Sequence, residues 1–248
     1  MDITKHTKFV SDTLDHDSFI VHDVADDNAC FYRAIANQLF YRSRYNKAHI
    51  ICSKNNRFGT KTLDNVINDK LWGYDGKEQT KMAKILQQTA RKLLYKNRDK
   101  IIDVLGITVE DFVVDTHELE DMEELFEGWE HIDIYNEIYK SFAGKDVFMR
   151  HNNRLVSIKE RWGGAPEQWA LSKYFKMPIV IYHLQQYNKS KNRIEQGRLR
   201  NNRLTKNSRF RILQIFGLEY IDTMPKLNIL FKKTRNGGHY LTLYENEL

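Results

Sequence analysis

Apolar residues recur at helical spacing through much of the first two thirds of the chain. After Cys30 the apolar positions Phe31, Ala34, Ile35 and Leu39 follow one another at intervals of one to four residues that place them on one helix face, which predicts a helix. The same kind of spacing predicts four further helices, at Glu78–Leu105, His117–Phe126, Ile132–Phe142 and Pro166–Phe175.

The last third of the chain changes to short runs rich in Ile, Leu, Phe and Tyr, which are typical of strands. These runs are Pro178–Leu184, Phe210–Phe216, Leu227–Lys233 and His239–Glu245. Gly237 and Gly238 stand between the last two and predict a tight turn. We therefore expect an α+β protein in which a helical half packs on a small, mostly antiparallel β-sheet.

The chain has 248 residues, of which 41% are hydrophobic, and this is enough for one sizeable core. Neither a repeat nor a Pro/Gly/Ser-rich linker divides it, so we expect a single domain over residues 1–248 with an N-terminal extension at 1–18. No apolar run is long enough to predict a membrane span. The N-terminus does not resemble a secretion signal, and a total of two cysteines suits a reducing compartment. These features favour a cytoplasmic protein.

Charge is unevenly distributed, although the formal net charge is only +6. Residues Asp115–Glu130 are strongly acidic and Lys189–Arg211 strongly basic. The basic run is compatible with binding nucleic acid through its phosphates, but a solvated loop or hairpin has the same pattern and is favoured. No aromatic residue interleaves the run before Phe210, so a base-stacking surface is not indicated.

Cys30 has a setting that suits a nucleophile. It follows the polar, turn-forming stretch Asp26–Asp27–Asn28–Ala29 and opens the first predicted helix, where the helix dipole stabilises a thiolate. Backbone N–H groups of such a loop can also converge to form an oxyanion hole. A small buried side chain at a helix start fits the same local features. The other cysteine, Cys52, has no comparable neighbours.

His239 begins the last predicted strand, directly after two glycines. Taken alone, it fits either a catalytic base or a surface histidine at a hairpin turn. The chain has no HExxH or CxxC spacing, no P-loop and no GxGxxG, so we expect neither a metal nor another cofactor.

Three separated blocks, in this order, resemble the ovarian-tumour (OTU) family of cysteine proteases. They are DNACFYRAIANQL (Asp27–Leu39), WGGAPEQWALSKYFKMPIVIY (Trp162–Tyr182) and GGHYLTLY (Gly237–Tyr244). Residues 41–160 match only loosely. The resemblance implies an OTU-like fold and a deubiquitinating thiol protease, which hydrolyses isopeptide or peptide bonds at the C-terminus of ubiquitin. Its partner would be ubiquitin, polyubiquitin or a ubiquitin-like modifier.

Position by position, the resemblance implies that Cys30 is the nucleophile and His239 the general base. Asp27 would shape the loop before the nucleophile. The oxyanion hole would then come from the backbone N–H groups of Asp27, Asn28, Ala29 and Cys30.

The chain departs from the family pattern at two positions. Asn28 stands where the family usually has glycine, and Leu241 where it often has an Asp or Asn that orients the histidine. The orienting residue could be Asn236, Thr242, a distant Asn or Asp, or none. Two alternatives therefore stay open: a catalytically inactive ubiquitin-binding module, and a nucleic-acid-binding protein that uses Lys189–Arg211.

Overall fold

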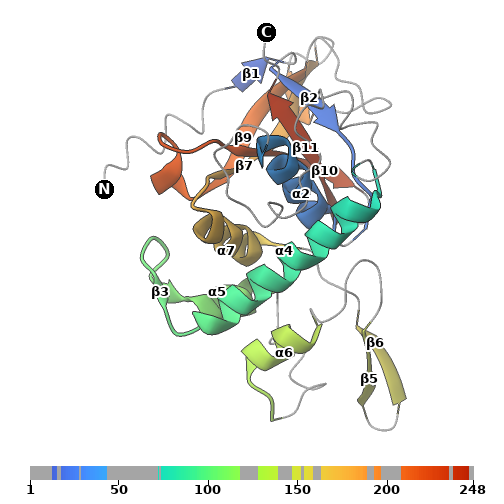
Figure 1. The fold of residues 1–248 in the computed structure, drawn as a ribbon, viewed down its shortest axis with the longest axis vertical. Coiled ribbons are helices and arrows are strands. Elements are labelled where there is room, and N and C mark those ends of the chain that lie inside the picture. Colours follow the sequence, from blue (N-terminus) through green and yellow to red (C-terminus); the bar gives the residue numbers. More distant parts are fainter. Residues whose placement is uncertain are drawn as a thin grey trace.

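A computed structural model describes the following parts of the chain: residues 13–15, 18–27, 29–43, 72, 74–117, 128–138, 147–151, 154–158, 163–188, 193–196, 208–234 and 237–245. Within these ranges, helices pack against a twisted β-sheet (Figure 1). The α+β class expected from the sequence is confirmed. No helix of the described residues is both long and apolar enough to cross a membrane.

The main sheet has seven strands, in the order β1–β9–β7–β10–β11–β2, with β8 paired to β7. All neighbours are antiparallel except β7 and β10. The four predicted strands correspond to β7, β9, β10 and β11, whereas β1, β2 and β8 were not predicted. The strand bounds are β1 Thr13–Asp15, β2 Phe19–His22, β7 Ile179–Asn188, β8 Arg193–Gln196, β9 Ser208–Phe216, β10 Leu227–Thr234 and β11 Gly237–Glu245.

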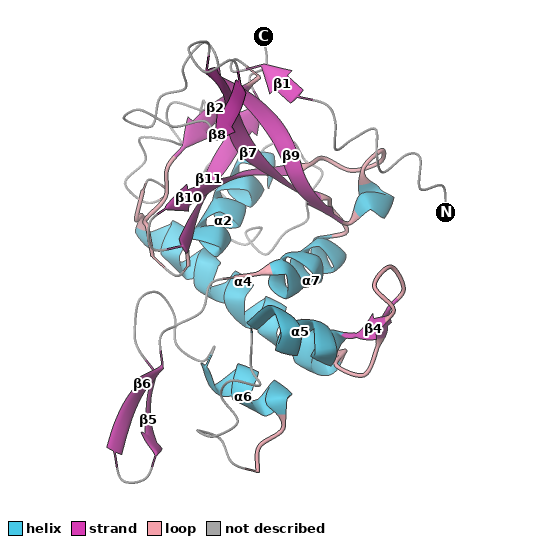
Figure 2. Cartoon of the chain, turned by 180° about the vertical axis from the view of Figure 1, so that it is seen from behind, coloured by secondary structure: helices cyan, strands magenta, loops and turns pink. Residues whose placement is uncertain are grey.

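Helix α2 lies between the sheet and helix α4, with β11 on one side and α4 on the other (Figures 1 and 2). Helices α5 and α7 continue this helical layer. Two short hairpins, β3–β4 and β5–β6, are separate from the main sheet. The bounds are α2 Cys30–Ser43, α4 Lys77–Lys96, α5 Val109–His117, α6 His131–Ile138, α7 Ala165–Phe175, β3 Ile101–Ile102, β4 Ile107–Thr108, β5 Val147–His151, β6 Arg154–Ile158 and the 3-10 turn η2 Leu218–Tyr220.

The predictions of helices at Cys30 and Pro166 are confirmed, but the predicted helix Glu78–Leu105 is too long. Helix α4 ends at Lys96, because Asn97 Nδ2 donates to the Leu93 carbonyl at 2.6 Å and closes the last turn. The following apolar residues belong to the β3–β4 hairpin. Its turn contains Gly106 at φ +70°, a backbone angle that favours glycine.

The two predicted helices that follow are only partly covered by the described residues. Helix α5 ends at His117, where the sequence pattern had placed a helix start, and residues 118–127 lie outside the described ranges. Helix α6 agrees with the next prediction as far as Ile138. Its predicted remainder, 139–142, lies outside the described residues.

The two glycines before His239 lie inside strand β11, so the prediction that they form the turn is wrong. Gly237 pairs with Thr234 and Gly238 with Lys233. A Cβ atom on Gly238 would lie 2.0 Å from Cε2 of Phe231. The Phe231 ring occupies that space and packs against Tyr240, with 5.2 Å between the ring centroids. Glycine is therefore required here by close packing rather than by a turn.

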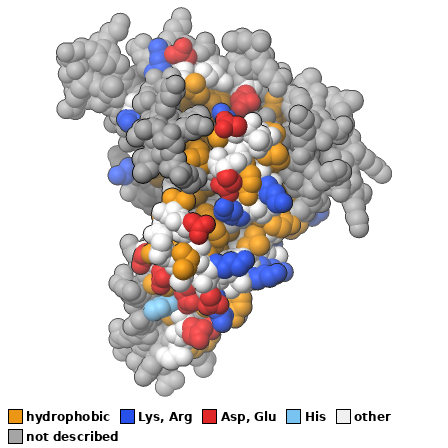
Figure 3. All heavy atoms as spheres, turned by 90° about the vertical axis from the view of Figure 1, so that its left-hand side faces the viewer, with side chains coloured by type: hydrophobic (Ala, Val, Ile, Leu, Met, Phe, Trp, Pro, Cys, Tyr) orange, Lys and Arg blue, Asp and Glu red, His pale blue; other side chains and the backbone are white. Residues whose placement is uncertain are grey.

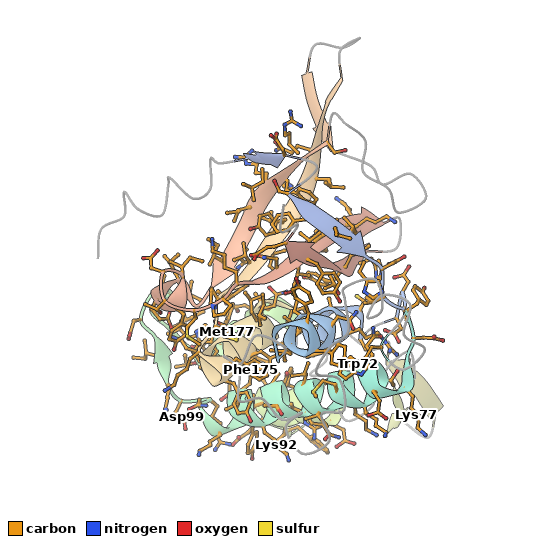
Figure 4. All side chains as sticks on the ribbon, turned by 45° about the horizontal axis from the view of Figure 1, so that its top comes forward. Trp72, Lys77, Lys92, Asp99, Phe175 and Met177 are labelled. Atoms are coloured by element: carbon orange, nitrogen blue, oxygen red, sulfur yellow. The ribbon has the colours of Figure 1, made fainter. Side chains whose placement is uncertain are left out.

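The apolar core forms two clusters, one on each side of the sheet. The larger fills the space between the helices and the sheet. In Figure 4, Trp72 and Lys77 lie near one end of α4 and Asp99 lies near the other. Trp72 closes one end by stacking on Phe40, with 4.0 Å between ring centroids. The smaller cluster consists of Phe19, Val180, Tyr182, Leu184, Phe210, Leu230, Leu241 and Leu243.

A fully buried carboxylate, Glu167, connects three helices. It accepts hydrogen bonds from Tyr135 Oη at 2.7 Å, from His117 Nε2 at 3.0 Å and from the Gly164 N–H at 2.7 Å. Burial raises the pKa of Glu167, but the charge of His117 and these hydrogen bonds outweigh burial and hold the pKa below its usual value. The carboxylate therefore stabilises the packing of α5, α6 and α7 in its ionised form.

Replacing Gly238 by alanine should destabilise the protein by about 1–3 kcal/mol, because the new methyl group overlaps the Phe231 ring. Urea unfolding of the purified variant measures this. Phe231→Leu provides the control, since a smaller side chain makes room for the methyl group. The double variant should lose less free energy of unfolding than the sum of the losses in the two single variants. Strictly additive losses would contradict the explanation.

Replacing Glu167 by glutamine should lower the free energy of unfolding at pH 7 by about 1.5–3 kcal/mol, because charged hydrogen bonds are lost. The folded-state pKa of Glu167 is lowered, so its contribution is present above about pH 4.3 and disappears as the pH falls through the folded-state value. Urea unfolding at a series of pH values tests this. Glu219→Gln, at the exposed ion pair with Lys173, should change stability by less than about 1 kcal/mol.

Candidate active site

Residues 23–29 form the loop between β2 and α2, and backbone contacts hold it in place. The Ala25 N–H donates to the Tyr74 carbonyl at 2.8 Å, and the Asp26 N–H donates to Tyr74 Oη at 3.3 Å. At the other end of the loop, the Cys30 N–H donates to the Asp27 carbonyl at 3.0 Å. The loop is therefore fixed both to the segment before α4 and to the start of α2.

Cys30 is the first residue of α2 and is only 1% exposed. Its Sγ accepts the backbone N–H of Tyr240, on strand β11, at 3.5 Å. The thiol thus lies at the positive end of the helix and against the strand that carries His239. Residues more than 200 positions apart are brought together at this point.

His239 is buried, and its Nε2 lies 2.9 Å from Oδ1 of Asp23. Asp23 directly follows β2, which pairs with β11, and its Oδ1 also accepts the N–H of Val24 at 3.0 Å. The backbone therefore fixes the carboxylate, which in turn fixes the imidazole ring. Asp23 is placed as the residue that orients His239, a role that sequence analysis had left open among several residues.

The other ring nitrogen, Nδ1, lies 3.2 Å from Oδ1 of Asp26. Among the described residues it has no aligned hydrogen-bond partner, so its attraction to the Asp26 carboxylate is one between charges. The Asp26 side chain is 67% exposed, whereas that of His239 is 4% exposed. One buried imidazole is thus flanked by two carboxylates and one thiol.

These neighbours control the charge of His239. Burial lowers its pKa, but the hydrogen bond to Asp23 and the proximity of Cys30 and Asp26 outweigh burial and raise the pKa to about 9. At neutral pH the ring is therefore an imidazolium. A cysteine beside it can act as the thiolate of an ion pair, which is the reactive form of a thiol nucleophile.

Asp27 contacts both the loop before Cys30 and helix α2. Its Oδ1 accepts the N–H of Ala29 at 3.1 Å, and its carboxylate forms a bidentate ion pair with Arg33, at 2.9 Å from Nη2. Arg33 also donates to Gln79 Oε1 and Thr80 Oγ1 on α4. Because Arg33 is buried, removing it would leave Asp27 without its cation and release the loop from α4.

The predicted oxyanion donors are only partly available in this arrangement. The N–H groups of Ala29 and Cys30 both donate to Asp27, one to its carboxylate and one to its carbonyl. Asn28 lies outside the described residues. To hold an oxyanion with the Cys30 N–H, the loop must therefore break its internal hydrogen bond to the Asp27 carbonyl.

Two residues predicted as candidates to orient His239 have other positions. Thr242 donates from Oγ1 to the Ala34 carbonyl at 3.4 Å and accepts from Asn37 at 3.5 Å, so its hydroxyl faces α2. Asn236 lies outside the described residues. Sequence analysis did not single out Asp23. The available signal was its place after the short apolar run Phe19–Val21, but nothing local relates that run to His239.

The basic run Lys189–Arg211 is described only at 193–196 and 208–211, which belong to strands β8 and β9. There, Arg209 Nε lies 2.9 Å from Asp15 Oδ1. On the face of the molecule in Figure 3, the acidic and basic side chains are interspersed. Within the described ranges, no group of three or more His, Cys, Asp or Glu side chains could hold a metal ion.

Comparison of the sequence with models of known protein families and with curated proteins gives no match.

Replacing Asp23 by asparagine should lower the pKa of His239 from about 9 toward 6.5, because the charged hydrogen bond to Nε2 is lost. NMR titration of the ring C–H resonance measures this. The raised pKa stabilises the folded protein fully below about pH 6.5, and this contribution is lost as the pH rises through about 9. The stability difference between wild type and Asp23→Asn should therefore disappear at high pH. An unchanged pKa would contradict the role of Asp23.

Proposed function

We propose that this protein is a cysteine protease of the OTU type, which hydrolyses the bond between the C-terminal glycine of ubiquitin and a lysine amine. Two lines of reasoning support the proposal. The sequence blocks around Cys30, Gly163 and His239 resemble the OTU family in order and spacing, and an α2 helix opened by the cysteine lies against the strand of the histidine. We propose an OTU-like fold on the same grounds.

The observation that carries the proposal is the hydrogen bond between His239 Nε2 and Asp23 at 2.9 Å, together with the proximity of Cys30 to the same imidazole. Leu241 has no side-chain acceptor, so the sequence left the orienting residue of the histidine open. Asp23 supplies that acceptor from the neighbouring strand. A thiol, an imidazole and a carboxylate thus lie together, and this set supports roles as nucleophile, base and orienting acid in acyl transfer.

In the acylation step, the Cys30 thiolate attacks the carbonyl carbon and forms an S–C bond. His239 passes the proton on Nδ1 to the leaving nitrogen, the C–N bond breaks, and the amine departs. Asp23 keeps Nε2–H directed away from the substrate, so Nδ1 is the nitrogen that exchanges the proton. The product is a thioester between Cys30 and the ubiquitin glycine.

In the deacylation step, neutral His239 takes a proton from water at Nδ1 as the oxygen adds to the thioester carbon. The C–S bond breaks, the thiolate returns to Cys30, and the new carboxylic acid loses its proton to solvent. The imidazolium–thiolate pair is restored, ready for another substrate. Both steps pass through an oxyanion, which backbone N–H groups near Cys30 would hold once the loop opens toward it.

One observation favours a second candidate function, a ubiquitin-binding module without catalysis. Cys30 is only 1% exposed, and the N–H groups of Ala29 and Cys30 donate within their own loop. If substrate does not shift this loop, the thiol stays covered and lacks oxyanion donors. Such a protein would bind ubiquitin without reacting with it, so the two candidates differ in one measurable property.

Incubation with ubiquitin that carries a thiol-reactive group at its C-terminus should give a covalent adduct with the wild-type protein. The adduct should be lost in Cys30→Ala and retained in Cys52→Ala, which is the matched control for a second thiol. In His239→Gln the rate of adduct formation should fall on the order of a hundredfold or more, since the thiolate loses its partner.

The alternatives give different results in the same assay. Binding of ubiquitin by a folded wild-type protein without any adduct would support the inactive module. An adduct that persists in Cys30→Ala would contradict the assignment of the nucleophile. Binding of a nucleic acid duplex that weakens steeply with added salt, without ubiquitin binding, would instead favour use of the basic run Lys189–Arg211.

A further inference from the structure

The site contains a second carboxylate, that of Asp26, although a thiol–imidazole–carboxylate site requires only one. Asp23 already orients His239 through Nε2, yet Asp26 Oδ1 lies 3.2 Å from the opposite nitrogen, Nδ1. The contact lacks the alignment of a hydrogen bond, so Asp26 is not needed to hold the ring. Its side chain is 67% exposed, whereas the groups that it faces are buried.

The backbone holds Asp26 at this place independently of its carboxylate. Its N–H donates to Tyr74 Oη at 3.3 Å, and the preceding N–H, of Ala25, donates to the Tyr74 carbonyl at 2.8 Å. The next residue, Asp27, is fixed by its ion pair with Arg33. The Asp26 side chain therefore extends from a loop that is fixed by its backbone. Its carboxylate lies between solvent and Nδ1 of His239.

Nδ1 is also the atom that must protonate the leaving nitrogen, because Nε2 is occupied by Asp23. During this transfer the leaving nitrogen comes within about 3 Å of Nδ1, and so within reach of the Asp26 carboxylate. A lysine nitrogen carries positive charge when its bond to the carbonyl carbon breaks, and the freed amine becomes an ammonium ion at neutral pH. A fixed carboxylate at that place stabilises such charge.

We propose that Asp26 is a specificity-determining residue of this site, which favours leaving groups that become cationic, such as the lysine amine of an isopeptide bond, over leaving groups that stay neutral. This inference rests on the proposed protease function. It places the part of the substrate that lies beyond the scissile bond next to the exposed carboxylate of Asp26. Asp23 acts on the ring alone, whereas Asp26 acts on both the ring and the leaving group.

Two substrates with the same acyl group separate these effects. One is ubiquitin joined through its C-terminus to the side-chain amine of a lysine peptide, and the other is ubiquitin joined to aminomethylcoumarin, an aromatic amine that stays neutral when it leaves. Attack by the Cys30 thiolate is common to both. An effect of Asp26 on the attack by Cys30 therefore cancels in the ratio of the two kcat/KM values, and a change in the ratio reports on the departure of the leaving group.

Asp26→Asn should lower the ratio of lysine to coumarin kcat/KM about two- to fivefold, as expected for an exposed charge pair, and Asp26→Glu should retain part of the preference. The effect should shrink at high salt, which screens exposed charges. Asp75→Asn is the matched control. It removes the same charge from an exposed residue next to Tyr74 and should leave the ratio unchanged.

Equal losses on both substrates in Asp26→Asn would overturn the inference while leaving the protease function intact, because Asp26 would then not distinguish the two leaving groups. The same ratio change in Asp75→Asn would also overturn it, by showing an effect of net charge alone. If the wild-type protein cleaves neither substrate and forms no adduct with the ubiquitin probe, the proposed function itself fails and the inference falls with it.

Discussion

The site depends on the complete burial of helix α2. Every described residue from Ala29 to Tyr41 is buried, including the polar side chains Arg33, Asn37 and Gln38. Buried polar groups are costly unless they are hydrogen-bonded, so each one fixes a contact. Arg33 bonds the loop and α4, Asn37 bonds Thr242 on β11, and Gln38 donates to carbonyls on β10 and β11. A rotation or shift of α2 would break these bonds together, and the position of Cys30 relative to His239 follows from them.

The burial of α2 also explains how the loop before Cys30 is held, because hydrogen bonds within the loop and to α2 fix it. The Asp27 carboxylate is shared between Arg33, which belongs to the buried helix, and the Ala29 N–H, which belongs to the loop. This arrangement makes the loop a continuation of the helix packing. It also uses the N–H groups that an oxyanion would need. Substrate binding must therefore repay the loss of the hydrogen bond from Cys30 to the Asp27 carbonyl, a cost of about 0.5–1.5 kcal/mol for a typical neutral pair.

The features that could be predicted from the sequence are those whose pattern lies among neighbouring residues. The helix at Cys30, the α7 helix and strands β7, β9, β10 and β11 follow from periodicity, and the pairing of Cys30 with His239 from a resemblance of short blocks. The end of α4 and the role of Gly238 were missed, because Ile101 and Ile102 fit a helix as well as a hairpin and two glycines fit a turn as well as a crowded strand. In both cases the deciding neighbour, Asn97 or Phe231, acts through side-chain contacts that spacing does not reveal.

Asp23 shows why the remaining part of the site could not be read from the sequence. Leu241 stands where the OTU family pattern often has an orienting Asp or Asn. It is fully buried in an apolar cluster with Phe19 and Leu243, and a carboxylate there would be strongly disfavoured. Strands β2 and β11 pair with His22 opposite Thr242. Continued by one residue, this register places Asp23 at the level of Leu241. Strand pairing thus brings Asp23, at the end of β2, beside Leu241 on β11, where the apolar core requires a leucine. The two residues are more than 200 positions apart, so their proximity follows from the pairing of the strands and not from any local pattern in the sequence.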